Sequence, residues 1–120
     1  MVKRQILIVD DQVGIRLLLT DVLENEGYQV EEATTGKQAL EKLHKANFDL
    51  IILDYKIPVM DGAQVLREME EENVEVPAIL MSGLAENLGA EVSKFKLVKK
   101  MIAKPFNINE FVEEVRAIID

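Results

Sequence analysis

Short apolar runs alternate with amphipathic stretches along the whole chain, and this alternation constrains the fold more than any other feature. Each run has the β-branched, uninterrupted character of a strand that is buried on both faces of a sheet. The predicted strands are Gln5–Val9, Tyr28–Ala33, Leu50–Leu53, Ala78–Met81 and Leu97–Ala103. Strands that are separated by helices pair in parallel through right-handed crossovers. We therefore expect an α/β fold of five βα units with a doubly wound parallel sheet, as a single domain over residues 1–120.

Between the strands, apolar residues recur at helical spacing and mark the faces that pack on the sheet. The first such stripe is Ile15, Leu18, Leu19, Val22 and Leu23. Gly27 is placed to end this helix as its C′ residue. The last helix is predicted to start at Asn107, with Glu110 three residues later as in a capping box. A fourth helix of uncertain limits is indicated by Leu88, Val92 and Phe95.

Composition excludes several classes of function. The 120 residues carry 22 acidic and 14 basic side chains, a net charge of −8, which opposes non-specific binding to nucleic acid or to an anionic membrane. The chain has no cysteine, and its one histidine, His44, is expected at the surface of the second helix, so thiol chemistry and a histidine zinc site are excluded. No apolar run approaches the roughly 20 residues that span a bilayer, and no signal-peptide pattern is present. We expect a cytoplasmic protein.

Polar residues follow four of the five predicted strands, where an open parallel sheet gathers its functional groups. They are Asp10 and Asp11 after the first strand, Asp54 after the third, Ser82 after the fourth and Lys104 after the fifth. Each of these residues alone has a simpler interpretation, because Asp and Ser at strand ends often cap the next helix and a lone lysine is usually a surface charge. Together they are expected to converge on one edge of the sheet.

Such a cluster needs a cation. Three carboxylates and one ammonium leave a formal charge of −2, and crowded carboxylates raise one another's pKa. Hard oxygen ligands favour Mg²⁺, with Mn²⁺ as the other candidate. A metal ion, an ammonium and a hydroxyl can stabilise the equatorial oxygens of a transferring phosphoryl group. Asp54, alone at the end of the most apolar strand, is the best candidate for the nucleophile.

These residues carry a resemblance to a known family. The segments ILIVDD at 6–11, LDYKIPVMDG at 53–62, Ser82-Gly83 and AKPF at 103–106 resemble the receiver domain of bacterial two-component response regulators. The resemblance spans essentially the whole chain and implies a flavodoxin-like sheet with strand order 2-1-3-4-5. The finer patterns at 10–19 and 54–62 are similar to those of the single-domain regulators of sporulation phosphorelays.

The resemblance implies a role for each motif residue. Asp54 would accept the phosphoryl group, Ser82 and Lys104 would contact it, and the Lys104-Pro105 bond is often cis in this family. Mg²⁺ would be held by Asp10, Asp11, Asp54 and the backbone carbonyl of Lys56. Partner helices would dock on Gln12, Gly14, Ile15, Arg16, Leu18, Pro58, Leu84, Pro105 and Phe106. The helical spacing of Ile15 and Leu18 is equally compatible with a place in the core, whereas Arg16 lies off the apolar stripe and is expected to be exposed.

Two departures from the family pattern concern the last strand. Met101 stands where many receivers have an aromatic switch residue, and Leu97-Val98 stands where many have Gly-Ala. Dimerisation through that region is therefore not expected, and we predict a monomer. Neither Lys56 nor Leu84, which would flank the path of an attacking water, carries a carboxylate or amide. Self-dephosphorylation is therefore predicted to be slow.

The sequence thus predicts a phosphoryl-relay protein rather than an enzyme that turns over a small molecule. It would take a phosphoryl group from the phosphohistidine of a sensor histidine kinase onto Asp54 and pass it to a histidine phosphotransferase, with sporulation initiation as the expected process. The alternative is the receiver part of a DNA-binding transcriptional regulator. A haloacid dehalogenase-type hydrolase would need a second Asp at position 56, which is Lys56. Asp10 and Asp11 would repel a flavin phosphate, and a dinucleotide-binding G-x-G-x-x-G is absent.

Overall fold

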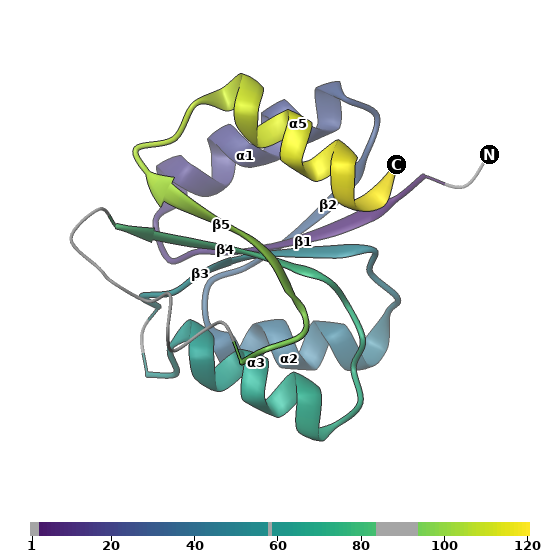
Figure 1. The fold of residues 1–120 in the computed structure, drawn as a ribbon, viewed down its shortest axis with the longest axis vertical. Coiled ribbons are helices and arrows are strands. Elements are labelled where there is room, and N and C mark those ends of the chain that lie inside the picture. Colours follow the sequence, from purple (N-terminus) through teal and green to yellow (C-terminus); the bar gives the residue numbers. More distant parts are fainter. Residues whose placement is uncertain (1–2, 58, 84–93) are drawn as a thin grey trace.

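The chain folds as five parallel strands in the order β2-β1-β3-β4-β5 (Figure 1). The computed structural model describes residues 3–57, 59–83 and 94–120. The strands are β1 (Gln5–Val9), β2 (Gln29–Ala33), β3 (Leu50–Asp54), β4 (Ala78–Gly83) and β5 (Val98–Lys104). The helices among these residues are α1 (Val13–Asn25), α2 (Gly36–Lys45), α3 (Gly62–Glu71) and α5 (Ile108–Ile119). The expected flavodoxin-like α/β architecture and strand order are confirmed.

Helices cover both faces of the sheet (Figure 1). α1 and α5 lie on one face, over a core that includes Ile6, Ile8 and Phe111. α2 and α3 lie on the other, over a core that includes Leu7 and Leu53. Alternate residues of β1 therefore enter opposite cores, which explains why this strand reads as a continuous apolar run. The central strand β3 is buried at every position, so its last residue, Asp54, is held in a rigid place.

Local sequence signals set the ends of the helices. Gly27 follows the C-cap of α1 with a φ of 96°, the left-handed conformation that favours glycine, so the predicted C′ role is confirmed. The Asn107 side chain accepts a hydrogen bond from the Glu110 amide at 3.1 Å and caps α5 as predicted. Asp61 caps α3 in the same way, through the Gln64 amide at 2.9 Å.

Strand limits differ from the prediction where neighbouring strands extend the ladder. β3 continues to Asp54 and β4 to Gly83, because Asp54 pairs with Met81 and Ser82 pairs with Ala103. Asp54 and Ser82 therefore lie within strands instead of after them. β2 begins at Gln29 and β5 runs from Val98 to Lys104, each one residue later than predicted at its start.

The predicted fourth helix falls mostly outside the described residues, which leave out Leu88 and Val92. Phe95 is described and is not helical. Phe95 is buried in the core beneath α2 and α3. Its apolar character therefore reflects the burial of a loop residue and not a place on a helical face. Among the helices of residues 3–57, 59–83 and 94–120, none is long and apolar enough to cross a membrane.

Candidate functional site

Three carboxylates meet at the carboxyl ends of β1 and β3. Asp10 follows β1 and is 1% exposed, whereas Asp54 ends β3 and is 7% exposed. Asp11, the next residue along the loop, is exposed. The register that pairs Val9 with Leu53 places these strand ends side by side. One carboxylate oxygen from each residue lies within 4.8 Å of the others, so the three side chains form one acidic cluster.

Lys104 brings a positive charge to this acidic cluster from the end of β5. Its Nζ lies 3.1 Å from Asp10 Oδ2 and 3.3 Å from Asp54 Oδ2. Burial alone would lower the pKa of Lys104, but the hydrogen bond to Asp10 and the charge of Asp54 outweigh it and raise that pKa. Lys104 therefore stays protonated and bridges the two buried carboxylates. The Lys104-Pro105 peptide bond is cis, as the family resemblance implies.

The ionisation of Asp54 is strongly disturbed. Burial, reinforced by the charge of Asp10, raises the pKa of Asp54 to about 6. The charge and hydrogen bond of Lys104 act in the opposite direction without cancelling the effect. Asp54 is thus a buried carboxylate that gains from any cation or bond that relieves its charge, which is the setting expected for a nucleophile.

The remaining predicted site residues lie at the same edge. Ser82 is buried in β4, one position beyond the residue that pairs with Asp54. Lys56 lies two residues after Asp54, in the loop that follows β3, and is exposed. Its backbone carbonyl is part of that loop. The structure therefore gathers the predicted phosphoryl and metal residues at one end of the sheet, as the parallel topology requires.

The predicted partner surface is described in part, because Pro58 and Leu84 lie outside the described residues. Gln12 and Gly14 are exposed at the start of α1, and Leu18 is 38% exposed, so it is not a core residue. Ile15 is half-buried against the core beneath α1 and α5. Beyond β5, Pro105 is exposed and Phe106 packs its ring 5.6 Å from that of Phe111.

Arg16 is not exposed as predicted, since its side chain is only 14% exposed. It lies off the apolar stripe but turns back over the end of β1, where it donates hydrogen bonds to the Asp10 carbonyl and to Glu32. The apolar stripe predicts the direction in which a side chain leaves the helix. It does not predict which polar groups a long side chain can reach. His44 is exposed and pairs with Glu72 at 3.1 Å, which confirms its surface position.

Two apolar residues of α1 were missed by the sequence prediction. Val13 and Leu17 are 62% and 63% exposed, the highest values among the large apolar side chains of this helix. They stand four residues apart and therefore share one face. A signal for them was present, because both are apolar and both lie outside the stripe that packs on the sheet.

The acidic cluster fits a divalent cation. It offers carboxylate oxygens from three residues within 4.8 Å, which are the hard ligands that Mg²⁺ and Mn²⁺ prefer. Two of the three residues are buried, and Lys104 leaves part of their negative charge uncompensated. Burial raises the pKa of Asp54 first and the charge of Asp10 adds to it, and a bound cation would oppose both by stabilising the ionised form.

The fold and the residues gathered at this edge of the sheet agree with the family comparison. The family model of the response regulator receiver domain matches residues 6–116, and the chain belongs to this family. Receiver domains interact with sensor kinases and phosphotransferases and generally bind Mg²⁺.

Individual relatives show which receivers are similar to this chain. It is 41% identical to sporulation initiation phosphotransferase F of Bacillus subtilis over 97% of this chain and 94% of that protein. It is 38% identical to the transcriptional regulatory protein ResD of Bacillus subtilis over 96% of this chain, but this covers only 48% of ResD. A CheY-like receiver domain protein from Methanospirillum hungatei superposes with a TM-score of 0.90 at 30% identity, over 99% of this chain and 95% of that one.

Proposed function

We propose that the protein is a phosphoryl-relay receiver that accepts a phosphoryl group on Asp54. The observation that supports this most directly is the placement of a buried carboxylate with a pKa of about 6 within 3.3 Å of Lys104 Nζ. An attacking carboxylate and a protonated amine at one edge of the sheet are two of the protein groups that in-line phosphoryl transfer uses.

In the proposed reaction, a carboxylate oxygen of Asp54 attacks the phosphorus of a phosphohistidine on a sensor kinase. The P–N bond breaks as the O–P bond forms, its electron pair stays on the leaving imidazole nitrogen, and that nitrogen takes up a proton from solvent. Lys104 balances charge on a phosphoryl oxygen, and the Ser82 hydroxyl donates to another. The reverse reaction with a second histidine passes the group to a histidine phosphotransferase.

The metal assignment belongs to the same proposal. Asp10, Asp11, Asp54 and the carbonyl of Lys56 would hold Mg²⁺, with Mn²⁺ as a substitute. The bound cation would neutralise carboxylate charge and stabilise the charge that develops on the phosphoryl oxygens. Asp10 also keeps Lys104 in place, because its Oδ2 accepts the lysine hydrogen bond at 3.1 Å.

The apolar face of α1 supports docking of a partner helix. Val13, Leu17 and Leu18 are exposed beside the loop that carries Asp10 and Asp11. Exposed apolar groups of this kind mark protein interfaces, and their position would deliver a phosphohistidine to the edge that holds Asp54. The protein would act in this way as a cytoplasmic monomer and would bind neither nucleic acid nor membrane. Sporulation initiation is the process proposed on the similarity to the Bacillus phosphotransferase.

A second candidate is a receiver that controls transcription through an attached DNA-binding part. The observation that favours it is the 38% identity to ResD, of which this chain spans about half. The length of the native reading frame separates the two candidates. So does onward transfer, because only the relay passes its phosphoryl group rapidly to a histidine phosphotransferase.

The test is Mg²⁺-dependent labelling with acetyl phosphate and then with the phosphorylated sensor kinases of the source genome. Asp54→Asn should abolish labelling, whereas Asp61→Asn, which changes an exposed carboxylate that caps α3, should leave it intact, because Asn caps as well as Asp. Labelling of Asp54→Asn at the wild-type level would contradict the proposal.

A further inference from the structure

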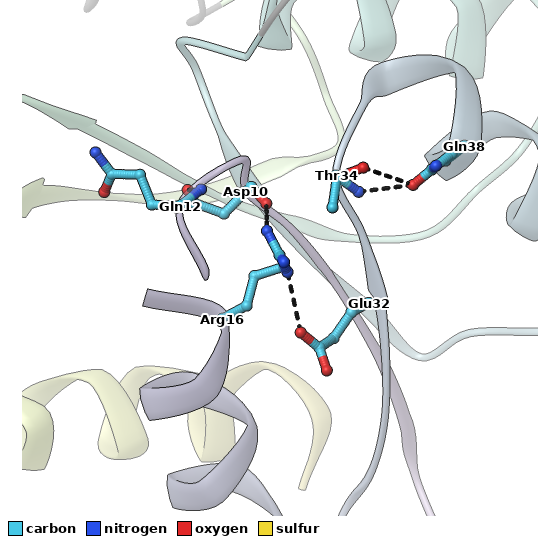
Figure 2. Close-up of polar contacts among 6 residues, drawn as sticks. All are labelled: Asp10, Gln12, Arg16, Glu32, Thr34 and Gln38. Carbon is cyan, nitrogen blue, oxygen red and sulfur yellow. Dashed lines mark hydrogen bonds and ion pairs between the residues drawn. The ribbon is translucent and has the colours of Figure 1, made fainter. Parts of the chain in front are cut away.

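Arg16 joins three elements behind the acidic cluster. Its Nη1 donates a hydrogen bond of 2.8 Å to the carbonyl oxygen of Asp10, at the end of β1. Its Nε donates one of 3.1 Å to Glu32 Oε1, on β2 (Figure 2). The guanidinium thus reaches from α1 to the residue that follows β1 and to β2, and the Arg16 side chain is 14% exposed. A group held on two sides and largely buried is poorly placed to contact a partner protein.

With the Arg16 contact, the amide, the carboxylate and the carbonyl of Asp10 are all hydrogen-bonded. The Asp10 amide donates to the Ala33 carbonyl at 3.1 Å. Its carboxylate accepts from the Gln12 amide at 2.9 Å through Oδ1 and from Lys104 through Oδ2. The carbonyl is the remaining polar group, and Arg16 holds it. This carbonyl belongs to the peptide bond that leads to Asp11, so its direction determines where the Asp11 side chain leaves the backbone.

Glu32 makes this arrangement compatible with a cation. An unpaired guanidinium behind Asp10 would add a positive charge close to the acidic cluster and would repel a divalent ion. The ion pair with Glu32 balances that charge while the hydrogen bond to the carbonyl remains. Arg16 suits the task better than lysine would, because its planar fork can donate in two directions at once.

The end of β2 is itself anchored. Gln38 Oε1 accepts hydrogen bonds of 2.9 Å from both the amide and the hydroxyl of Thr34, directly beyond β2 (Figure 2). Glu32 therefore stands on a strand that is tied to α2 at its carboxyl end, and it offers Arg16 a fixed partner.

From these contacts we propose that Arg16 and Glu32 form a positioning pair that orients the Asp10–Asp11 peptide and thereby sets the cation affinity of the acidic cluster. The inference rests on the proposed function of that cluster. It assigns Arg16 to the interior of the site, instead of to the partner surface, and gives a role to Glu32, which no motif of the sequence singles out.

The test measures Mg²⁺ affinity of the full chain by isothermal titration calorimetry. Arg16→Ala should weaken Mg²⁺ binding about tenfold, the lower end of the effect of removing a group that orients a metal ligand. Arg16→Lys and Glu32→Gln should weaken it less but in the same direction. The matched control is Glu31→Gln, which breaks the 3.1 Å ion pair between the neighbouring β2 residue and Lys42 and should leave Mg²⁺ affinity unchanged.

Two further measurements separate positioning from general stability. Glu32→Gln should have no additional effect on Mg²⁺ affinity in the Arg16→Ala background, because Glu32 acts through Arg16. Amide hydrogen exchange at Asp11 and Gln12 should accelerate in metal-free Arg16→Ala but not in Glu31→Gln. If Arg16→Ala does not fold, Mg²⁺ affinity and amide hydrogen exchange are measured on Arg16→Lys and Glu32→Gln instead.

Two outcomes would overturn the inference. If Arg16→Ala bound Mg²⁺ and reacted with acetyl phosphate like the wild type, but lost transfer from a kinase, Arg16 would be a partner contact. Failure of the proposed function would look different, because the wild type itself would then neither bind Mg²⁺ nor be labelled. Even if the wild type did not bind Mg²⁺, amide hydrogen exchange would still test the positioning role. Unchanged exchange at Asp11 and Gln12 in Arg16→Ala would overturn that role, and faster exchange would support it.

Discussion

Asp54, the proposed phosphoacceptor, is unfavourable for the stability of the metal-free protein at neutral pH. Its pKa rises from 3.8 to about 6, first because it is buried and then because Asp10 is close. The folded state therefore binds the proton more tightly than the unfolded state does. The resulting stability is fully present below pH 3.8 and is lost as the pH rises through about 6. At neutral pH the ionised Asp54 destabilises the metal-free protein.

Replacing Asp54 with a neutral isostere should therefore stabilise the metal-free protein. We expect Asp54→Asn to raise the free energy of unfolding by about 1–2 kcal/mol at pH 7.5, after allowance for the weakened contact with Lys104. The gain should grow between about pH 4 and pH 7 and should be flat above that range. Urea unfolding in EDTA across this pH range measures it.

The control for this prediction is Asp61→Asn, which neutralises an exposed carboxylate without removing a helix cap. Its free energy of unfolding should stay within about 0.5 kcal/mol of the wild type at each pH. A pH-independent gain in Asp54→Asn would contradict the assignment, since only titration of Asp54 produces the expected rise.

The single residues that sequence patterns predicted well are those with a positional signature. Gly27 is one, because a helix that ends in a left-handed residue favours glycine there. The predicted exposure of Arg16 was wrong, because its partners, Asp10 just after β1 and Glu32 on β2, come from two parts of the chain that the local sequence does not connect. Tertiary contacts determine the positions of long, flexible side chains. Their exposure therefore follows from the fold and not from the apolar pattern of the helix that carries them.

At the scale of elements, the turn that joins Asp54 to α3 depends on close backbone packing. The Gly62 amide donates to the Tyr55 carbonyl at 2.8 Å. A Cβ at Gly62 would lie 3.0 Å from Tyr55 Cα and 3.2 Å from the Asp54 carbonyl oxygen. Both neighbours are backbone atoms of the site and cannot move away cheaply. The glycine thus lets α3 begin directly beside the end of β3.

We expect Gly62→Ala to lower the free energy of unfolding by roughly 1–3 kcal/mol, as other overpacked sites do. Gly14→Ala is the matched substitution, because Gly14 is also near the start of a helix but a Cβ there meets no described atom within 4 Å. It should stabilise the protein by about 0.5–1 kcal/mol through the backbone entropy of glycine. Chemical denaturation of both variants checks the opposite signs, and equal effects would contradict the packing argument.

The elements themselves were predictable because their apolar periods are strong. β1 and β3 are buried on both faces and read as continuous runs, and the cap at Asn107 marked the start of α5. β5 was the weakest strand in the sequence, and the structure explains why. It lies at the edge of the sheet, where Lys99 and Lys100 are exposed and give the strand a mixed pattern.

At the scale of the whole molecule, parallel topology is what made the site predictable. All five strands point the same way, so the residues that end β1, β3 and β5 meet at one edge, although Asp10 and Lys104 are 94 residues apart. The partner surface was less predictable, because exposure of α1 residues depends on how far α5 and the sheet cover the helix. Val13 and Leu17 show this, since their burial is set by tertiary packing and not by their apolar character.

The exposed face of α1 leads to a prediction that separates docking from chemistry. Leu17→Glu places a charge in the middle of the proposed docking surface, beside Val13 and Leu18. Transfer from a phosphorylated kinase that labels the wild type should slow at least about tenfold, as for a residue central to an interface. Labelling by acetyl phosphate should be unchanged, because Leu17 is 63% exposed and is not part of the acidic cluster.

Leu17→Met is the matched control, since it keeps an apolar side chain of similar size and should retain most of the kinase-dependent rate. Rapid-quench measurements with both phosphodonors distinguish the effects. Arg16, one residue earlier on α1, should behave in the opposite manner, because Arg16→Ala slows both reactions if it orients the Asp10–Asp11 peptide. Equal losses with kinase and acetyl phosphate in Leu17→Glu would show that α1 supports the site from within and that partners dock elsewhere.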